Sequence, residues 1–205
     1  MNSLMLSRID SIAKEVIDSA MAPGMQVLVA RKGKVVYRKS FGYYTYDSIK
    51  KVDNSSIYDL ASVTKILGGL PMIMKAEEEG KFDLDASLGE LMPVLKGSNK
   101  DTVTVKEALS HYAKLKPYIP YYRTMVEGDD AVPMKKYFSN SNSGKYTIKV
   151  AEDLYLREDY RDTIFKLIAE APQREELGYK YSGLPFYLFK DYLEKEYKRP
   201  LDQLN

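Results

Sequence analysis

A serine and a lysine three positions apart, Ser62 and Lys65 in the run SVTK, are the residues best suited to chemistry. A serine hydroxyl is a weak nucleophile until a base removes its proton. Residues at positions i and i+3 share one face of a helix, so the Lys65 amine can reach the Ser62 hydroxyl. The positive end of a helix and burial would both favour the neutral amine that a general base requires. The spacing therefore predicts a serine nucleophile assisted by lysine.

The four-residue pattern S-x-x-K occurs three times in the chain, so the pattern alone does not select a site. The copies at 11–14 and 48–51 fall in a predicted opening helix and in a polar loop. Only the copy at 62–65 follows a transition from strand to helix and begins a long apolar helix. This context favours Ser62 over Ser11 and Ser48.

Composition excludes several other kinds of site. The 205 residues are 44% hydrophobic and 29% charged, as in an ordinary globular protein, and the net charge of +2 gives no case for nucleic acid. No apolar run is long enough for a membrane span. The sequence has no Cys and one His, His111, which excludes thiolate chemistry and multi-histidine metal sites, and no cofactor is expected. The first eight residues lack the secretory-signal pattern of a basic region followed by a long apolar stretch.

Hydrophobic periodicity predicts a helix, a hairpin and then a mostly helical remainder. Gly33 is expected to take a positive φ in the hairpin turn, and Thr104 to Glu107 forms a capping box that begins a short helix. Pro117 and Pro120 interrupt the segment after this short helix. Residues 127–150 are rich in Gly, Asn and Ser and predict a long surface loop or insertion. The other expected elements are a helix at 4–20, strands at 25–30 and 35–41, and helices at 62–80, 158–170 and 184–196.

The segment DLASVTKI (59–66) resembles the nucleophile segment of class C β-lactamases and of related low-molecular-weight penicillin-binding proteins and esterases. Further segments resemble the same family in the same order along the chain. Five ordered matches are far more specific than any one of them. The other four are QVLVARKGKVV (26–36), EGKFDLD (79–85), VTVKEALSH (103–111) and KYSG (180–183).

The resemblance implies an α+β fold of the β-lactamase/transpeptidase type over residues 1–205 as a single domain. A helix plus hairpin would occupy 1–60, and a mostly helical part 61–205, with the insertion at about 127–150. Ser62 would be acylated, Lys65 would assist its deprotonation, and Tyr181 would act as a second base or proton shuttle. The Ser62 N–H would supply one oxyanion donor. His111 would lie away from the chemistry, in a structural role.

The resemblance also implies a substrate class and a compartment. Substrates would be peptidoglycan-type peptides, β-lactams or small esters, and the location would be periplasmic or extracytoplasmic. Two departures limit this interpretation. Gly183 stands where the family's tyrosine motif has an amide or carboxylate side chain. No glycine follows Gly183, so the K-T-G or H-x-G strand is absent from this chain.

The missing strand predicts a domain that is incomplete at its C-terminal side and that has weak or no activity as it stands. The N-terminal hairpin would then lack its partner strands. We expect those strands to come from the remainder of a longer protein or from a partner chain, as in a homo-oligomer. Two other interpretations stay open. One is a catalytically inactive binding or accessory module of a cell-wall-active protein, and the other is a plain helical scaffold.

Overall fold

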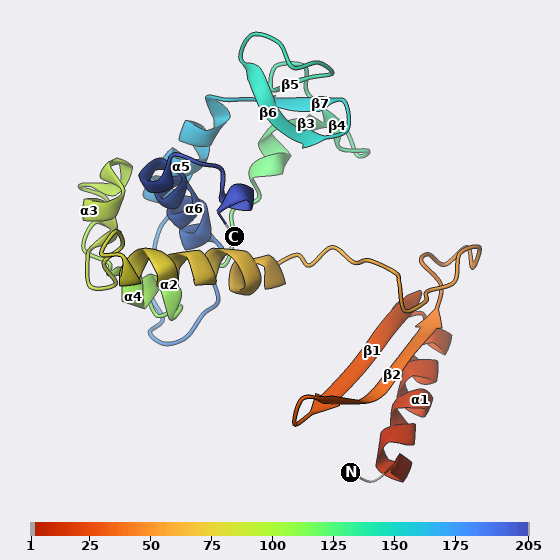
Figure 1. Ribbon diagram of the computed structural model, residues 1–205. Coiled ribbons are helices and arrows are strands. Elements are labelled where there is room, and N and C mark those ends of the chain that lie inside the picture. The colour runs from red at the N-terminus through yellow and green to blue at the C-terminus, as the bar shows by residue number, and fades with distance from the viewer. Residues whose placement is uncertain (1–2, 205) are drawn as a thin grey trace. The chain divides into compact units, whose positions relative to one another are not determined.

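The computed structural model describes residues 3–204, which fold into two compact units with the boundary between Leu60 and Ala61. The first unit holds one helix and one hairpin, and the second holds the remaining helices and a group of short strands (Figure 1). Each unit has its own internal packing. An α+β architecture results, as the resemblance implies. No helix within residues 3–204 has both the length and the apolarity needed to cross a bilayer.

The first unit consists of α1 (Ser3–Asp18), β1 (Gly24–Arg31) and β2 (Lys34–Gly42), so the predicted helix and hairpin are confirmed. Lys32 and Gly33 form the two-residue turn with φ of 50° and 73°. Positive φ at both positions is what a tight hairpin turn needs for the strands to keep their twist. Asp10 of α1 accepts hydrogen bonds from Tyr37 (2.7 Å) and Lys39 (2.8 Å) of β2, which attach the helix to the hairpin.

The second unit is built mainly from helices, several of them short. The predicted helices near 62–80, 104–109, 158–170 and 184–196 are all present, although the first differs in its opening turn. The capping box is confirmed, since Glu107 N donates to Thr104 Oγ1 and the Glu107 carboxylate accepts from Thr104 N. The elements are η1 (Lys65–Gly69), α2 (Leu70–Glu78), α3 (Leu88–Leu91), η2 (Pro93–Leu95), α4 (Val105–Leu109), η3 (Tyr121–Thr124), α5 (Tyr160–Glu170), α6 (Leu184–Tyr197) and η4 (Leu201–Gln203).

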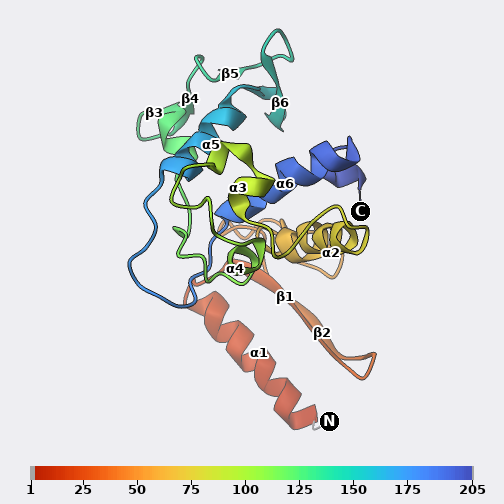
Figure 2. The ribbon, with the colours of Figure 1, turned by 90° about the vertical axis from the view of Figure 1, so that its left-hand side faces the viewer.

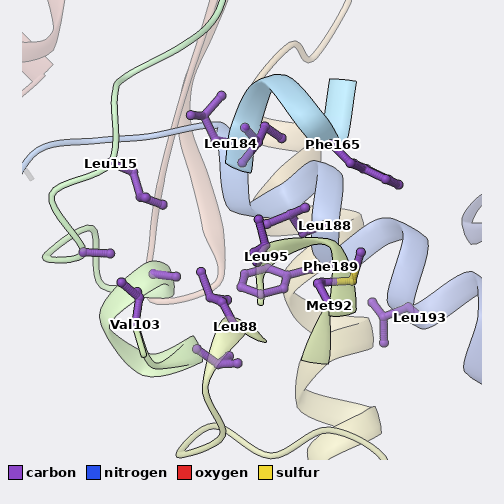
Figure 3. Close-up of a cluster of buried hydrophobic side chains, with 14 of the residues drawn as sticks. Leu88, Met92, Leu95, Val103, Leu115, Phe165, Leu184, Leu188, Phe189 and Leu193 are labelled. Atoms are coloured by element: carbon purple, nitrogen blue, oxygen red, sulfur yellow. The ribbon is translucent and has the colours of Figure 1, made fainter. Parts of the chain in front are cut away.

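Helix α6 is the centre of the second unit's core. It packs against η1, α2 and α5. Its buried side chains repeat at helical spacing, with Leu184, Leu188, Phe189 and Leu193 at most 1% exposed. Figure 3 shows these four converging with side chains from α3, α5 and the loops beside them. Burying an aliphatic side chain of this size contributes about 1.5–3 kcal/mol, so α6 is firmly held at its N-terminal end, where residues 181–183 enter.

Residues 127–150, predicted as a long surface loop or insertion, contain short strands, and one more strand lies just beyond them. The sheet β5-β7-β6 pairs β5 (Phe138–Ser139) and β6 (Tyr146–Ala151) with β7 (Leu154–Arg157). A separate pair joins β3 (Val126–Glu127) to β4 (Val132–Pro133). Two-residue strands carry no detectable alternation, which is why periodicity missed them. These strands lie at the end of the unit opposite α2 and α4 (Figure 1 and Figure 2).

Lys100 is an unusual member of the core because its side chain is only 1% exposed. Its ammonium donates to the main-chain oxygens of Ala169 (3.2 Å) and Ala171 at the C-terminal end of α5. This end of a helix carries unpaired carbonyls and a partial negative charge. Burial lowers the pKa of Lys100 from 10.5 to about 8, with the charge of Lys116 adding to the effect.

We predict that the Lys100→Met variant loses about 1–3 kcal/mol of unfolding free energy at pH 9.5, because two buried carbonyls lose their donor. The loss should be smaller at pH 7.5. Since the pKa of Lys100 is lower in the folded state than in the unfolded chain, the parent gains stability as the pH rises from about 8 towards 10.5. The neutral amine keeps two hydrogens for the two carbonyls. Denaturant unfolding at both pH values, with the exposed Lys96→Met as control, tests this; an equal loss at both would contradict it.

Candidate active site

Ser62 lies in a tight turn that leads into the first helix of the second unit. Ala61 has a φ of 43°, in the left-handed region that alanine rarely adopts. Two main-chain bonds close the turn, from Thr64 N to Ala61 O (3.2 Å) and from Lys65 N to Ser62 O (3.1 Å). The turn leaves the Ser62 side chain exposed at the surface of the unit. An exposed hydroxyl at a strained turn is accessible to an incoming substrate.

The helix after this turn opens as a π-helix rather than as the α-helix predicted from residue 62. In η1 the Leu70 N–H donates to Lys65 O, a spacing of five residues. Such wide turns occur mostly as short insertions in α-helices, often at functional sites. Gly68 and Gly69 lie in this segment, and an added Cβ at Gly69 would lie 3.4 Å from the Phe186 ring. The absence of a side chain at Gly69 therefore lets this segment pack closely against α6.

Three side chains meet at the Ser62 hydroxyl. Lys65 Nζ donates to Ser62 Oγ at 3.1 Å, and Tyr181 OH donates to the same oxygen at 3.0 Å. Lys65 is close to Ser62 in the sequence, whereas Tyr181 lies 119 residues after Ser62. The structure thus brings together all three residues that the sequence singled out. A hydroxyl bonded to two titratable groups is arranged for transfer of its proton.

The electrostatics of the site act mainly on Tyr181. Its hydrogen bond to Ser62 lowers the pKa of the Tyr181 phenol from its ordinary value of 10, and the nearby Lys65 ammonium lowers it further, while partial burial opposes both. The Lys65 Nζ also lies 6.0 Å from the centre of the Tyr181 ring. The pKa moves in the direction that stabilises a phenolate, which is the form able to take a proton from serine.

His111 does not lie where the resemblance placed it. We expected it away from the chemistry, but its ring centroid lies 4.8 Å from that of Tyr181. His111 follows the end of α4 and has a left-handed φ of 64°, a value outside the range of right-handed helices. His111 therefore lies beyond the short helix, beside the ring of Tyr181.

Gly183 leaves an open space beside the lysine. A Cβ built at this position would lie 3.7 Å from Lys65 Cε and 4.0 Å from Pro117 O, both ordinary contact distances. The φ of Gly183 is −82°, so any residue can adopt this backbone conformation. The position can thus accept a side chain directed at Lys65, although this chain has none there.

A pocket with a volume of about 490 Å³ opens beside the Ser62 hydroxyl. Its walls are mostly aromatic or aliphatic, with Lys190 as an additional cation. Sequence reasoning missed these wall residues. The usable signal was the spacing on α6, where Phe186 and Lys190 are one turn apart and follow the KYSG motif. The apolar wall residues are Tyr118, Ile119, Tyr121, Leu184, Phe186 and Tyr187.

Side chains that could hold a metal ion do not cluster within residues 3–204. No three acidic or histidine side chains in that range come close enough together to act as ligands of one ion. The titratable groups at the Ser62 hydroxyl are the lysine and tyrosine described above.

The order and spacing of these residues can be compared with known proteins. A family model described as Beta-lactamase matches residues 9–204, which is nearly the whole chain. The chain belongs to the beta-lactamase family. Among curated beta-lactamase relatives, the enzyme named Beta-lactamase from Providencia stuartii is 26% identical over 164 residues, covering 74% of this chain and 42% of that protein. Protein flp of Staphylococcus aureus (strain NCTC 8325 / PS 47) is 30% identical over 106 residues, covering 50% of this chain and 21% of that protein.

Solved structures show the same fold. The octameric penicillin-binding protein homologue from Pyrococcus abyssi superposes with a TM-score of 0.68 at 21% identity, covering 97% of this chain and 40% of that chain. A class C beta-lactamase gives 0.66 at 17% identity, covering 98% and 47%. EstCE1, a hydrolase with promiscuous acyltransferase activity, gives 0.64 at 23% identity, covering 97% and 49%. The chain thus has the β-lactamase/transpeptidase fold and spans less than half the length of these proteins.

We predict that Lys65→Met raises the pKa of Tyr181 relative to the parent, because the variant loses a cation and a hydrogen-bond donor beside the phenol. An NMR titration of the tyrosine Cζ resonances measures this, and Tyr181→Phe assigns the signal among the 18 tyrosines. Lys190→Met is the matched control, since Lys190 lines the same pocket without contributing to the shift at Tyr181. An unchanged Tyr181 pKa in Lys65→Met would contradict the coupling.

Proposed function

We propose that Ser62 is the nucleophile of an acyl-transferring serine hydrolase of the β-lactamase and penicillin-binding-protein kind. The observation that carries this proposal is the Ser62 hydroxyl itself, which lies 3.1 Å from Lys65 Nζ and 3.0 Å from Tyr181 OH at the mouth of a pocket. Membership of the beta-lactamase family supports the reaction class. The chain covers 42% of the Providencia stuartii beta-lactamase, so the reaction of a protein of that length is part of this proposal.

In the proposed reaction, the Tyr181 phenolate accepts the Ser62 proton while Ser62 Oγ bonds to the substrate carbonyl carbon. The Lys65 ammonium stabilises the phenolate before the transfer, in line with the lowered Tyr181 pKa. The carbonyl oxygen then carries the negative charge, and the Ser62 N–H is one donor for it. Tyr181 next gives its proton to the departing amine or alcohol, which leaves the acyl group on Ser62. Water attacks this ester by the same steps in reverse, losing its proton to Tyr181.

The pocket supports a substrate whose acyl part is aromatic or aliphatic. Tyr118, Phe186 and Tyr187 line the same pocket as Ser62, and burial of apolar groups against their rings favours binding. Lys190 adds a positive charge suited to a carboxylate on the same substrate. Peptides, β-lactams and small esters remain the proposed classes. A role in cell-wall chemistry outside the cytoplasm follows from the family resemblance.

We predict that a fluorophosphonate probe or a fluorescent penicillin labels the parent covalently and does not label Ser62→Ala, because only the parent carries the attacking oxygen. In-gel fluorescence with mass mapping of the labelled peptide measures this. Tyr181→Phe should slow labelling by about 10²–10⁴-fold, the range of a lost general base, while leaving the fold intact. Tyr187→Phe, a pocket tyrosine without a bond to Ser62, is the matched control. Equal labelling of parent and Ser62→Ala would refute Ser62 as the nucleophile.

We predict that Gly183→Asn speeds labelling by about tenfold or more, because it supplies a hydrogen-bonding amide beside the reacting groups. The space at 3.7 Å from Lys65 Cε accepts the new side chain without strain. Gly183→Ala, which adds the Cβ alone, is the control and should label at the parent rate. The rate constants come from time courses with one probe concentration. A parent that is not labelled, together with a Gly183→Asn variant that is, would favour the alternative of a catalytically inactive binding module.

A further inference from the structure

The segment that carries Tyr181 has little regular structure of its own. Residues 171–183, between α5 and α6, contain no helix or strand. The Tyr181 side chain is 40% exposed, so packing alone does not hold its phenol against Ser62. A general base must stay within hydrogen-bond reach of the proton it removes. Other contacts must therefore hold this stretch of backbone in place.

His111 makes those contacts on both sides of Tyr181. The Lys180 N–H donates to the His111 main-chain oxygen at 2.9 Å. The Ser182 N–H donates to His111 Nδ1 at 3.3 Å. Between these two bonds, the imidazole lies against the Tyr181 ring at 4.8 Å between centroids and an angle of 55°. One residue thus contacts the backbone before Tyr181, the backbone after it and the ring itself.

The geometry of His111 also defines its protonation state. Because Nδ1 accepts a hydrogen bond from a main-chain N–H, it carries no proton, and the neutral ring has its hydrogen on Nε2. The left-handed φ of 64° turns the chain after α4. This turn allows the main-chain oxygen and the Nδ1 atom of His111 to face the same segment, residues 180–182. A protonated imidazole would present an N–H to the Ser182 N–H, and that bond would be lost.

We propose that His111 is the positioning residue for Tyr181: its neutral ring fixes residues 180–182 so that the phenol reaches Ser62, and its protonation releases them. This inference rests on the proposed function for its catalytic consequence, although the contact itself can be tested separately. The resemblance gave His111 only a structural place away from the site. The contacts with Lys180, Tyr181 and Ser182 instead connect it to the reacting hydroxyl.

The groups around the ring determine the pH at which release occurs. Tyr179 lies on one side at 5.7 Å between centroids, Tyr181 on another, and the Lys65 ammonium acts from η1. Burial lowers the pKa of His111 below 6.5, and the charge of Lys65 lowers it further. The folded state therefore keeps the neutral ring at neutral pH. The contact is lost only as the pH falls below the ordinary histidine range.

The first test observes the contact directly. His111 is the only histidine in the sequence, so its ring resonances are unambiguous in an NMR titration of the full chain. We expect a pKa below 6.5 and a protection factor for the Ser182 amide that falls by about tenfold or more as the ring protonates. The Gly183 amide, which donates to Pro117 O at 3.0 Å, is the internal control and should keep its protection. Constant Ser182 protection through the His111 titration would overturn the proposal, whether or not Ser62 reacts.

The second test measures the catalytic consequence by fluorophosphonate labelling rates from pH 5 to 8. Every variant that keeps Tyr181 should lose rate gradually as its phenolate fraction falls with pH, and the parent should show a second, steeper loss as His111 protonates. His111→Asn keeps a non-titrating acceptor near the Nδ1 position and suits a left-handed φ, so its rate should lack this steeper loss. His111→Phe keeps a ring but no acceptor and should be slow, by about 10–100-fold, at every pH.

Two comparisons separate positioning from general destabilisation. In a Tyr181→Phe background, His111→Phe should cause no further loss, because the group it positions is already gone. Tyr179→Leu removes the ring that lies 5.7 Å from His111 and should leave the rate at pH 8 unchanged, because the neutral imidazole keeps its bond from the Ser182 N–H. An additive loss in the double variant, or the same steeper loss in His111→Asn, would overturn the positioning role. A parent that is never labelled would count against the proposed function, while Ser182 protection would still decide the contact.

Discussion

The candidate site depends on one shared acceptor, the Ser62 oxygen, which receives hydrogen bonds from Lys65 and Tyr181 at once. A serine that accepts from both neighbours is held in one rotamer, because both lone pairs of its hydroxyl oxygen are engaged. The two donors come from very different places. Lys65 is fixed by its own turn, whereas Tyr181 arrives on an irregular segment. Contacts from other parts of the unit are therefore needed to hold Tyr181 in place, whereas Lys65 is placed by its own turn.

Packing of the core around α6 holds the segment that carries Tyr181 in a defined position. Leu184 and Leu188 bury the start of α6, and Ser182 is itself 1% exposed, with its hydroxyl donating to Lys116 O at 2.7 Å. These contacts fix the chain just after Tyr181. Phe186 lies near Gly69, so the same helix end also contacts the segment that bears Lys65. All of the site groups lie within the second unit, and packing inside that unit determines their distances.

Sequence reasoning succeeded where the determinants are local. The Ser62 to Lys65 spacing, the capping box at Thr104 and the hairpin turn at Gly33 each depend on a few adjacent residues, and local rules describe them well. The family resemblance identified Tyr181, because no spacing rule connects residues 119 positions apart. Periodicity missed the two-residue strands and the π-turn of η1, since neither leaves a repeating pattern. The pocket walls and the place of His111 depend on tertiary packing of loops, which periodicity does not encode.

Residue 183 has no side chain to hold Tyr181 in place, and contacts from His111 take over this task. In the family pattern the third residue of the tyrosine motif carries a polar group, and here the backbone at that position contributes only an N–H to Pro117 O. The remaining polar contacts of this stretch go instead to His111 and to Lys116 O. With no side chain at residue 183, the orientation of the phenol depends on main-chain bonds, one of which ends on a titratable ring. A reaction that needs the Tyr181 phenolate and a neutral imidazole together is thereby confined to pH values at which both forms exist, above the His111 pKa and towards that of Tyr181.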